Sequence, residues 1–193
     1  MQFAQVDLSA ISLSQLQQGK GCKTSSANYN GAPCKFLLSG SEWFATPFGC
    51  STYDKDPAAT RLTCEIDVTG KDVLPLLQGL DRWVVEHVIQ NNLFENMTRE
   101  EVAKQYHPCI QFSEKYNAHR LRTKCNISGM TQCRWFRHPE KEPAKYDSLN
   151  LRASVIQPVI HLKGVWKQTN QWGLSLDLVK ALVDSNGSDA WDF

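Results

Sequence analysis

The sequence lacks long apolar runs and the short motifs by which many enzymes are recognised. No stretch of about 18 apolar residues occurs in the chain, which argues against a membrane-spanning helix. There is also no G-x-S-x-G elbow, phosphate loop, H-E-x-x-H pair or dinucleotide fingerprint. We therefore expect a protein without catalytic residues, without a cofactor and without a membrane partner.

Cysteine pairs at metal-ligand spacing are absent as well. The chain has 7 cysteines but no C-x-x-C pair, and its first residues show no secretory signal. Free thiols in a reducing compartment, cytoplasm or nucleus, are therefore expected. No metal is expected either, because the spacing of the zinc-compatible side chains fits no standard ribbon or finger; these are His107, Cys109, Cys125, Cys133 and His138.

The formal net charge of +1 conceals a strong segregation of charge. Residues 54–101 contain ten acids against five bases, whereas residues 113–167 contain eleven Lys and Arg against four acids. Residues 119–138 contain no acid, and the last ten residues contain three Asp and no base. A basic block followed by an acidic tail is typical of a protein that binds a polyanion.

Hydrophobic periodicity predicts strands, then helices, then strands again. Residues 61–68 alternate between apolar and polar side chains, as in a half-buried strand. Apolar residues then recur at helical spacing over 72–92, and Thr98 with Glu101 forms a capping box for a second helix. Strands are expected again at 119–127, 131–138 and in two closing segments, with an exposed loop at 139–150.

This order predicts a mainly β, α+β fold: an OB-like antiparallel β-barrel with one or two helices. We expect one domain over residues 1–183, with a helical insert near 72–106. Residues 184–193 are expected to form an acidic, mobile tail.

Two of the predicted strands combine an apolar face with a cationic face. Arg120, Arg122 and Lys124 alternate with apolar residues in one strand, and Lys163 and Lys167 share a side of another. Aromatic residues interleave with bases at Arg134-Trp-Phe-Arg137, where one ring must face outward. Exposed rings among cations are stacking platforms for unpaired bases. The candidate nucleic-acid-binding residues are Trp43, Arg120, Arg122, Lys124, Arg134, Trp135, Phe136, Arg137, Lys163, Trp166 and Lys167.

The chain ends in Asp189-Ala-Trp191-Asp192-Phe193. In this tail it resembles the single-stranded-DNA-binding (SSB) proteins, whose bacterial and short-tailed-phage members end in acidic residues followed by Phe. Its closing segments, VIQPVIHLKGVWKQ and WGLSLDLVKALV, are similar to those of OB-barrel proteins of phages and large DNA viruses. The resemblance implies weak sequence preference, possible homo-oligomers, and recruitment of a polymerase, helicase or other replication protein by Asp189, Trp191, Asp192 and Phe193.

The sequence thus favours a non-catalytic protein that binds single-stranded DNA during replication, recombination or repair. Two other hypotheses remain open. One is a viral capsid or matrix β-protein whose basic face contacts other subunits. The other is a metal-dependent nuclease that uses acidic pairs such as Glu65 and Asp67.

Overall fold

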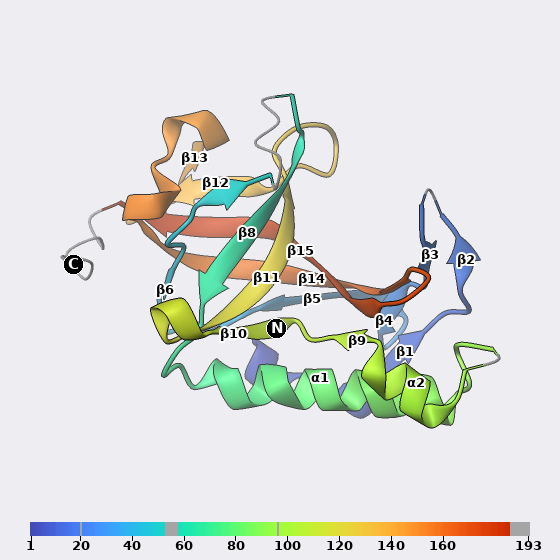
Figure 1. The fold of residues 1–193 in the computed structure, drawn as a ribbon. Helices are drawn as coiled ribbons and strands as arrows, with labels where there is room; N and C mark the ends of the chain where they lie inside the picture. Colours follow the sequence, from blue (N-terminus) through green and yellow to red (C-terminus); the bar gives the residue numbers. More distant parts are fainter. Residues whose placement is uncertain (20, 53–57, 96, 186–193) are drawn as a thin grey trace.

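Two long neighbouring strands, β14 (Val155–Lys167) and β15 (Trp172–Asp184), form the centre of the sheet. The computed structural model describes residues 1–19, 21–52, 58–95 and 97–185. Within these residues one sheet follows the order β1-β4-β5-β14-β15-β11-β8-β7 (Figure 1). The two closing segments were predicted as strands, and both predictions are confirmed.

On one side of this pair lie β11 (Ala118–Asn126) and β8 (Arg61–Asp67). In β8 the predicted alternation is confirmed, because Leu62, Cys64 and Ile66 are buried while the residues between them are not. In β11 the same alternation buries Leu121, Thr123 and Cys125 and leaves Arg122 and Lys124 exposed. β10 (Ile110–Ser113) pairs with the start of β11, and β7 (Cys50–Ser51) pairs with β8.

On the other side lies the N-terminal part of the chain. β5 (Ala32–Leu37), β3 (Lys23–Thr24) and β6 (Phe44–Ala45) each pair with β14. The remaining strands here are β1 (Ile11–Leu13), β2 (Gln17–Gln18) and β4 (Ala27–Tyr29), and two 3-10 turns precede them, Phe3–Gln5 and Leu8–Ala10.

Both predicted helices are present between β8 and β9. α1 (Val73–Gln90) buries Leu77, Leu80 and Val84, the apolar stripe that its periodicity predicted. α2 (Arg99–Lys104) begins at the capping box, in which Thr98 and Glu101 bond each other's backbone N–H groups. α1 runs beneath β10 and β9 (Tyr106–His107), as Figure 1 shows.

Trp172 joins this helical layer to the sheet. Its side chain is fully buried, its indole N–H donates to the Val102 carbonyl at 2.7 Å, and its ring meets Phe94 edge-on at 5.0 Å. A buried indole with a satisfied N–H is a strong packing anchor. The first residue of β15 is therefore fixed against α2.

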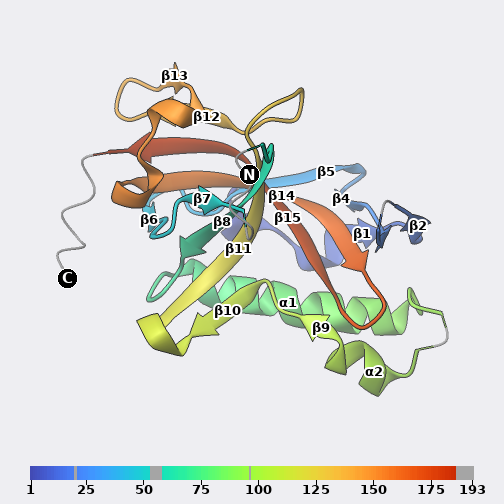
Figure 2. The same cartoon turned by 45° about the horizontal axis from the view of Figure 1, so that its top comes forward.

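The segment between β11 and β14 differs in detail from the prediction. Only Arg134–Arg137 of the strand expected at 131–138 is extended, as β12, and it runs parallel to the end of β15. The loop expected at 139–150 contains β13 (Glu142–Ala144) and a 3-10 turn, Tyr146–Ser148. Further 3-10 turns lie at Glu114–Tyr116 and Leu151–Ala153. Figure 2 shows β12 and β13 at the opposite end of β14 and β15 from β2.

The fold is mainly β with a helical insert and is consistent with an OB-like barrel, as predicted. The hydrogen-bonded path among the described strands ends at β1 and β7 and does not close on itself. OB barrels are themselves partly open. Of the helices in the described part of the chain, none is long and apolar enough to span a bilayer.

Candidate nucleic-acid interface

A groove of about 690 Å³ lies over the region where β8, β11, β15 and β14 run side by side. We call it the basic groove, because its lining includes four Lys and Arg side chains: Arg61, Arg122, Lys124 and Lys163. Polar side chains of Thr24, Ser25 and Ser26 form part of its wall. No acid is among the described residues that line it. The groove therefore presents charge of one sign to whatever enters it.

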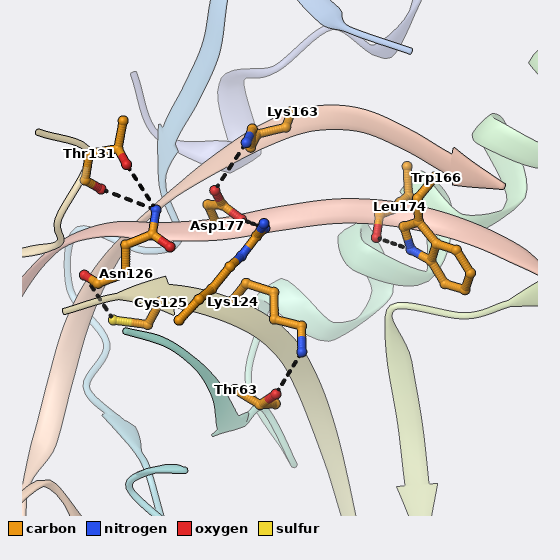
Figure 3. Close-up of polar contacts among 10 residues, drawn as sticks. Thr63, Lys124, Cys125, Asn126, Thr131, Lys163, Trp166, Leu174 and Asp177 are labelled. Atoms are coloured by element: carbon orange, nitrogen blue, oxygen red, sulfur yellow. Dashed lines mark hydrogen bonds and ion pairs between the residues drawn. The ribbon is translucent and has the colours of Figure 1, made fainter. Parts of the chain in front are cut away.

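The strand register explains why cations distant in sequence converge here. Lys124 in β11 lies opposite Asp177 in β15, and Arg61 in β8 lies opposite Asn126 in β11. Asp177 is 7% exposed, and its carboxylate accepts from Arg61 Nη2 at 2.9 Å and lies 3.5 Å from Lys163 Nζ. Figure 3 shows Lys163 approaching this carboxylate from the neighbouring strand. The buried Asp177 carboxylate thus positions two of the four cations, Arg61 and Lys163.

Lys124 lies on the same face, at the edge of this cluster. Its Nζ donates to the Thr63 hydroxyl at 2.9 Å (Figure 3). Partial burial lowers the pKa of Lys124, and the neighbouring charges of Arg122 and Arg61 lower it further. The crowding of like charges makes the ammonium less favourable than in water. An anion bound in the groove would relieve that repulsion.

Two rings flank the groove. Trp166 is half-buried, its indole N–H donates to the Leu174 carbonyl at 3.1 Å, and its ring lies 6.5 Å from that of His107. His107 contacts Gln111 through the two Nε2 atoms at 2.5 Å. Both side chains line the groove, so part of each ring faces the space where the cations converge. Such rings can stack on unpaired bases.

A half-buried carboxylate fixes the segment that carries His107. Asp81 on α1 accepts the hydroxyl of Tyr106 and the backbone N–H of Cys109, the latter at 3.0 Å. Burial raises the pKa of Tyr106 well above its ordinary value, and the Asp81 charge raises it further. The phenol therefore remains a hydrogen-bond donor, and β9 is held against α1.

Gly164 permits the close approach of the opposite wall. Its φ is +142°, and a Cβ at this position would lie 2.0 Å from the Ser25 carbonyl oxygen. Ser25 N–H donates to the Val165 carbonyl at 2.9 Å, which holds the segment around Ser25 over the strand. Only glycine adopts this backbone conformation readily and leaves room for Ser25.

A smaller pocket of about 260 Å³ adjoins the basic groove, and the two share Arg122. Its lining includes Phe48, Thr63, Glu65 and Arg152. The Arg152 Nε donates to the Phe48 carbonyl at 3.2 Å, which fixes the guanidinium beside the pocket. The smaller pocket therefore extends the polar surface of the basic groove to a further cation, Arg152.

Arg120 was predicted to contact phosphate but is tied into the protein. Its side chain is 13% exposed, its Nη1 donates to Glu65 at 3.0 Å, and its guanidinium carbon lies 4.5 Å and 4.6 Å from the rings of Phe48 and Tyr116. Cation–π stacking and an ion pair already satisfy this group. Arg120 is therefore a structural contact between β11 and β8, outside both pockets.

The β12 candidates do not reach the basic groove. Trp135 is 3% exposed and packs against Tyr146, so the prediction that it stacks on bases is wrong; in the alternation of a strand it is the inward ring. Phe136 is the outward ring and lies under Lys180 at 4.8 Å. Arg134 and Arg137 are exposed, and Arg137 donates to Ser148. Arg134 pairs with Lys180, four residues along β15 from Leu176, the nearest residue of that strand in the groove, which is about 13 Å at the rise of a strand.

Lys167 and Trp43 also lie elsewhere. The shared face predicted for Lys163 and Lys167 is wrong, because a register shift between Leu162 and Gly164 inverts the alternation of β14. Lys167 consequently points to the Phe94 ring, 5.3 Å away, whereas Trp166 turns into the groove with Lys163. Trp43 meets His138 edge-on at 5.1 Å.

The groove therefore unites four predicted residues, Arg122, Lys124, Lys163 and Trp166, with two that sequence reasoning missed. Arg61 is the first outward residue of a strand whose alternation was recognised, so its direction was predictable, although its neighbours were not. His107 is brought in by the parallel pairing of β9 with β15. The predicted tail residues Asp189, Trp191, Asp192 and Phe193 lie outside the described residues.

The fold is similar to that of phage single-stranded-DNA-binding proteins at low sequence identity. No protein-family profile matches the chain, and no curated protein matches it. Among solved structures, the single-stranded DNA-binding protein from bacteriophage Enc34 matches at 12% identity and a TM-score of 0.46, over 89% of this chain and 88% of that one. The same protein in complex with ssDNA matches at 8% identity and a TM-score of 0.45, over 89% of this chain and 94% of that one. Gp2.5, a single-stranded DNA-binding protein encoded by bacteriophage T7, matches at 12% identity and a TM-score of 0.47, over 79% of this chain and 87% of that one.

Proposed function

We propose that the protein binds single-stranded nucleic acid, with DNA as its ligand, in the basic groove. The observation that carries this proposal is the convergence of Arg61, Arg122, Lys124 and Lys163 from three strands on one groove without a lining acid. Cations arranged along a groove follow a phosphate backbone, and rings beside them stack on bases. The likeness to phage proteins is loose, so the proposal rests on this groove.

The size of the groove favours a single strand over a duplex. A volume of about 690 Å³ is within the range of small-ligand pockets and accommodates a few nucleotide units. Trp166 and His107 line the groove among the cations, where only an unpaired base presents its face to a ring. Hydroxyl and amide side chains of Thr24, Ser26 and Gln171 supply further hydrogen bonds without a fixed base code.

We propose a binding role without catalysis. The predicted nuclease alternative needs a cluster of carboxylates to hold magnesium, and Glu65 is instead paired with Arg120 at 3.0 Å. The predicted capsid or matrix alternative needs the basic face to bind other copies of the chain. Each makes a different prediction for the experiment below.

The tail and its partners belong to this proposal too. Asp189 and Asp192 would compete with phosphate for the basic groove, and the tail with Trp191 and Phe193 would recruit a polymerase, helicase or other replication protein. A tail displaced by DNA would be free to bind such a partner. Homo-oligomers, which the family resemblance implies, are compatible with this arrangement.

The experiment is a titration of fluorescent oligo-dT at a series of salt concentrations, with oligo-U and a duplex of equal length as competitors. Four phosphate contacts predict that log affinity falls with log salt at a slope of about −2.8, at roughly 0.7 per contact. Competition by the duplex at equal strength, or tighter binding of oligo-U, would contradict the proposal. Shortening of the oligonucleotide with magnesium would instead support a nuclease, and assembly without nucleic acid a structural protein.

A further inference from the structure

Four of the seven cysteines gather in one cluster on the buried side of the sheet. They are Cys50 in β7, Cys64 in β8, Cys125 in β11 and Cys133 just before β12. Cys50 lies directly opposite Cys64 in the pairing of β7 with β8, and Cys125 lies diagonally across from Cys64 in the pairing of β11 with β8. The backbone N–H of Cys133 donates to the carbonyl of Asn126, the residue after Cys125. Neighbouring thiols raise the pKa of Cys50 and of Cys133. We call these residues the thiol cluster. Nucleic-acid binding in the basic groove gives it no role.

The backbone brings the four cysteines together two by two, Cys50 with Cys64 and Cys133 with the end of β11 beside Cys125. A structural zinc site instead requires four ligands around one point. Searched over residues 1–19, 21–52, 58–95 and 97–185, the structure has no group of three or more His, Cys, Asp or Glu that could hold a metal ion. Pairwise chemistry between neighbouring thiols therefore fits this arrangement better than metal binding does.

One neighbouring pair has the backbone geometry of a disulfide. Cys50 and Cys64 are direct partners in the antiparallel pairing of β7 with β8. Directly opposed residues have Cα atoms about 4.5–5.5 Å apart, and disulfides span about 4.4–6.8 Å. Cys125 pairs with Leu62 in β8, so β8 lies between it and β7. Among the cysteines of β7, β8 and β11, Cys50 and Cys64 are therefore the pair that lies directly opposite in the sheet.

The two thiols differ in access. Cys64 is fully buried, whereas Cys50 is only partly buried on β7, at the end of the strand order. A small oxidant can therefore reach Cys50 while its partner stays beside it. Reversible oxidation favours an accessible cysteine of low pKa with a resolving thiol nearby. Cys50 has the access and the resolving thiol, whereas its neighbouring thiols and its burial raise its pKa, so it reacts with peroxide from a small thiolate fraction.

We propose that Cys50 and Cys64 form an oxidation site for peroxides. The Cys50 thiol attacks one peroxide oxygen, the O–O bond breaks, and Cys50 becomes a sulfenic acid while one water leaves. The Cys64 sulfur then attacks the Cys50 sulfur, the S–O bond breaks, and the hydroxyl leaves as a second water with the Cys64 proton. The two thiols lose two electrons and the peroxide gains them.

The bond would tie the edge strand β7 to β8. Ser51 and Thr63, which pair with each other next to Cys50 and Cys64, both line the smaller pocket beside Arg122. Oxidation would therefore fix the wall of that pocket while the basic groove stays open. This inference does not depend on the proposed function, because the disulfide is detected without nucleic acid.

The test is to treat the full chain with hydrogen peroxide, block the remaining thiols and map the peptides by mass spectrometry. We expect the loss of two free thiols per molecule, a linked peptide pair containing Cys50 and Cys64, and full reversal by dithiothreitol. Linkage of any other pair, or no linkage at peroxide concentrations that oxidise Cys22, would overturn the proposal. Zinc retained by the purified protein in native mass spectrometry, with all four thiols protected, would overturn it as well.

Two variants sharpen the result. In C64S, Cys50 has lost its resolving thiol, so we expect a sulfenic acid that dimedone traps. The matched control is C34S, which removes another fully buried cysteine that lies on β5 outside the thiol cluster, and we expect the Cys50–Cys64 linkage to be unchanged. Because the mapping is done on the unaltered chain, the proposal remains testable if a variant does not fold.

Discussion

The Asp177 carboxylate accepts a hydrogen bond from the Arg61 guanidinium at 2.9 Å beneath the basic groove. The Arg61 side chain is 48% exposed and that of Asp177 is 10% exposed, so the acid lies under the cation. Lys163 approaches the same carboxylate at 3.5 Å. One buried acid thereby both positions two cations and partly neutralises them.

The substitution Asp177→Asn tests this relationship. It removes a negative charge from a polyanion site while nearly preserving shape. We expect binding of oligo-dT to tighten about two- to five-fold at low salt, the effect of roughly 0.5–1 kcal/mol, with a steeper salt slope because Arg61 and Lys163 become fully available. The control is Asp184→Asn at the far end of β15, which should leave the slope unchanged. Weaker binding by Asp177→Asn would show that the carboxylate chiefly orients the cations.

Variants of Arg120 test whether this cation stabilises the fold or contacts phosphate. Its guanidinium pairs with Glu65 and stacks on Phe48 and Tyr116, so Arg120→Ala should lower the free energy of unfolding by roughly 1–3 kcal/mol in a urea titration. The salt slope of oligo-dT binding should not change. Arg120→Lys keeps the charge but loses the planar stack, and intermediate stability is expected. A reduced salt slope of oligo-dT binding, with unchanged stability, would show that Arg120 contacts phosphate.

The substitution Gly164→Ala tests whether the groove wall depends on the close approach of Ser25 to β14. An added Cβ would collide with the Ser25 carbonyl, and its backbone conformation alone is strained by roughly 1–3 kcal/mol for a side-chain residue. We expect Gly164→Ala to reduce stability by at least that amount and to weaken oligo-dT binding. The control is Gly79→Ala in α1, where no neighbouring atom lies within 4 Å and a gain of about 0.5–1 kcal/mol is expected. Equal stability of the two variants would contradict this description of the wall.

The acidic tail is tested by a chain that ends at residue 185. This truncation keeps β15 intact and removes Asp189 and Asp192. If the tail competes for the basic groove, oligo-dT should bind more tightly at low salt, and the difference should fade as salt screens the charges. The full-length double variant D189N/D192N should show the same gain. Unchanged or weaker binding by both would rule the competition out.

Local pattern was enough to predict the secondary structure around the groove. The alternation in β8 and β11, the apolar stripe of α1 and the capping box at Thr98 each depend on residues close in sequence. The prediction placed Arg122 and Lys124 on the exposed face for the same reason.

Errors arose where distant segments meet. The register shift before Gly164, where the Ser25 backbone packs closely, turned Lys167 away and Trp166 inward. No nearby residue signals that Arg120 is paired with Glu65, because their contact depends on the register of β11 against β8. A periodicity gives the face of a strand, whereas membership of a site depends on which strands become neighbours.

The salt dependence of oligo-dT binding in two double variants tests the central claim most directly. R122A/K124A removes two cations of the basic groove, whereas R134A/R137A removes two exposed cations on β12. Circular dichroism on both variants verifies that they fold. We predict that R122A/K124A reduces the slope by about 1.4, at roughly 0.7 per lost phosphate contact, and that R134A/R137A leaves it unchanged. The opposite pattern, a full slope in R122A/K124A and a reduced one in R134A/R137A, would place the nucleic acid on β12 and contradict the account.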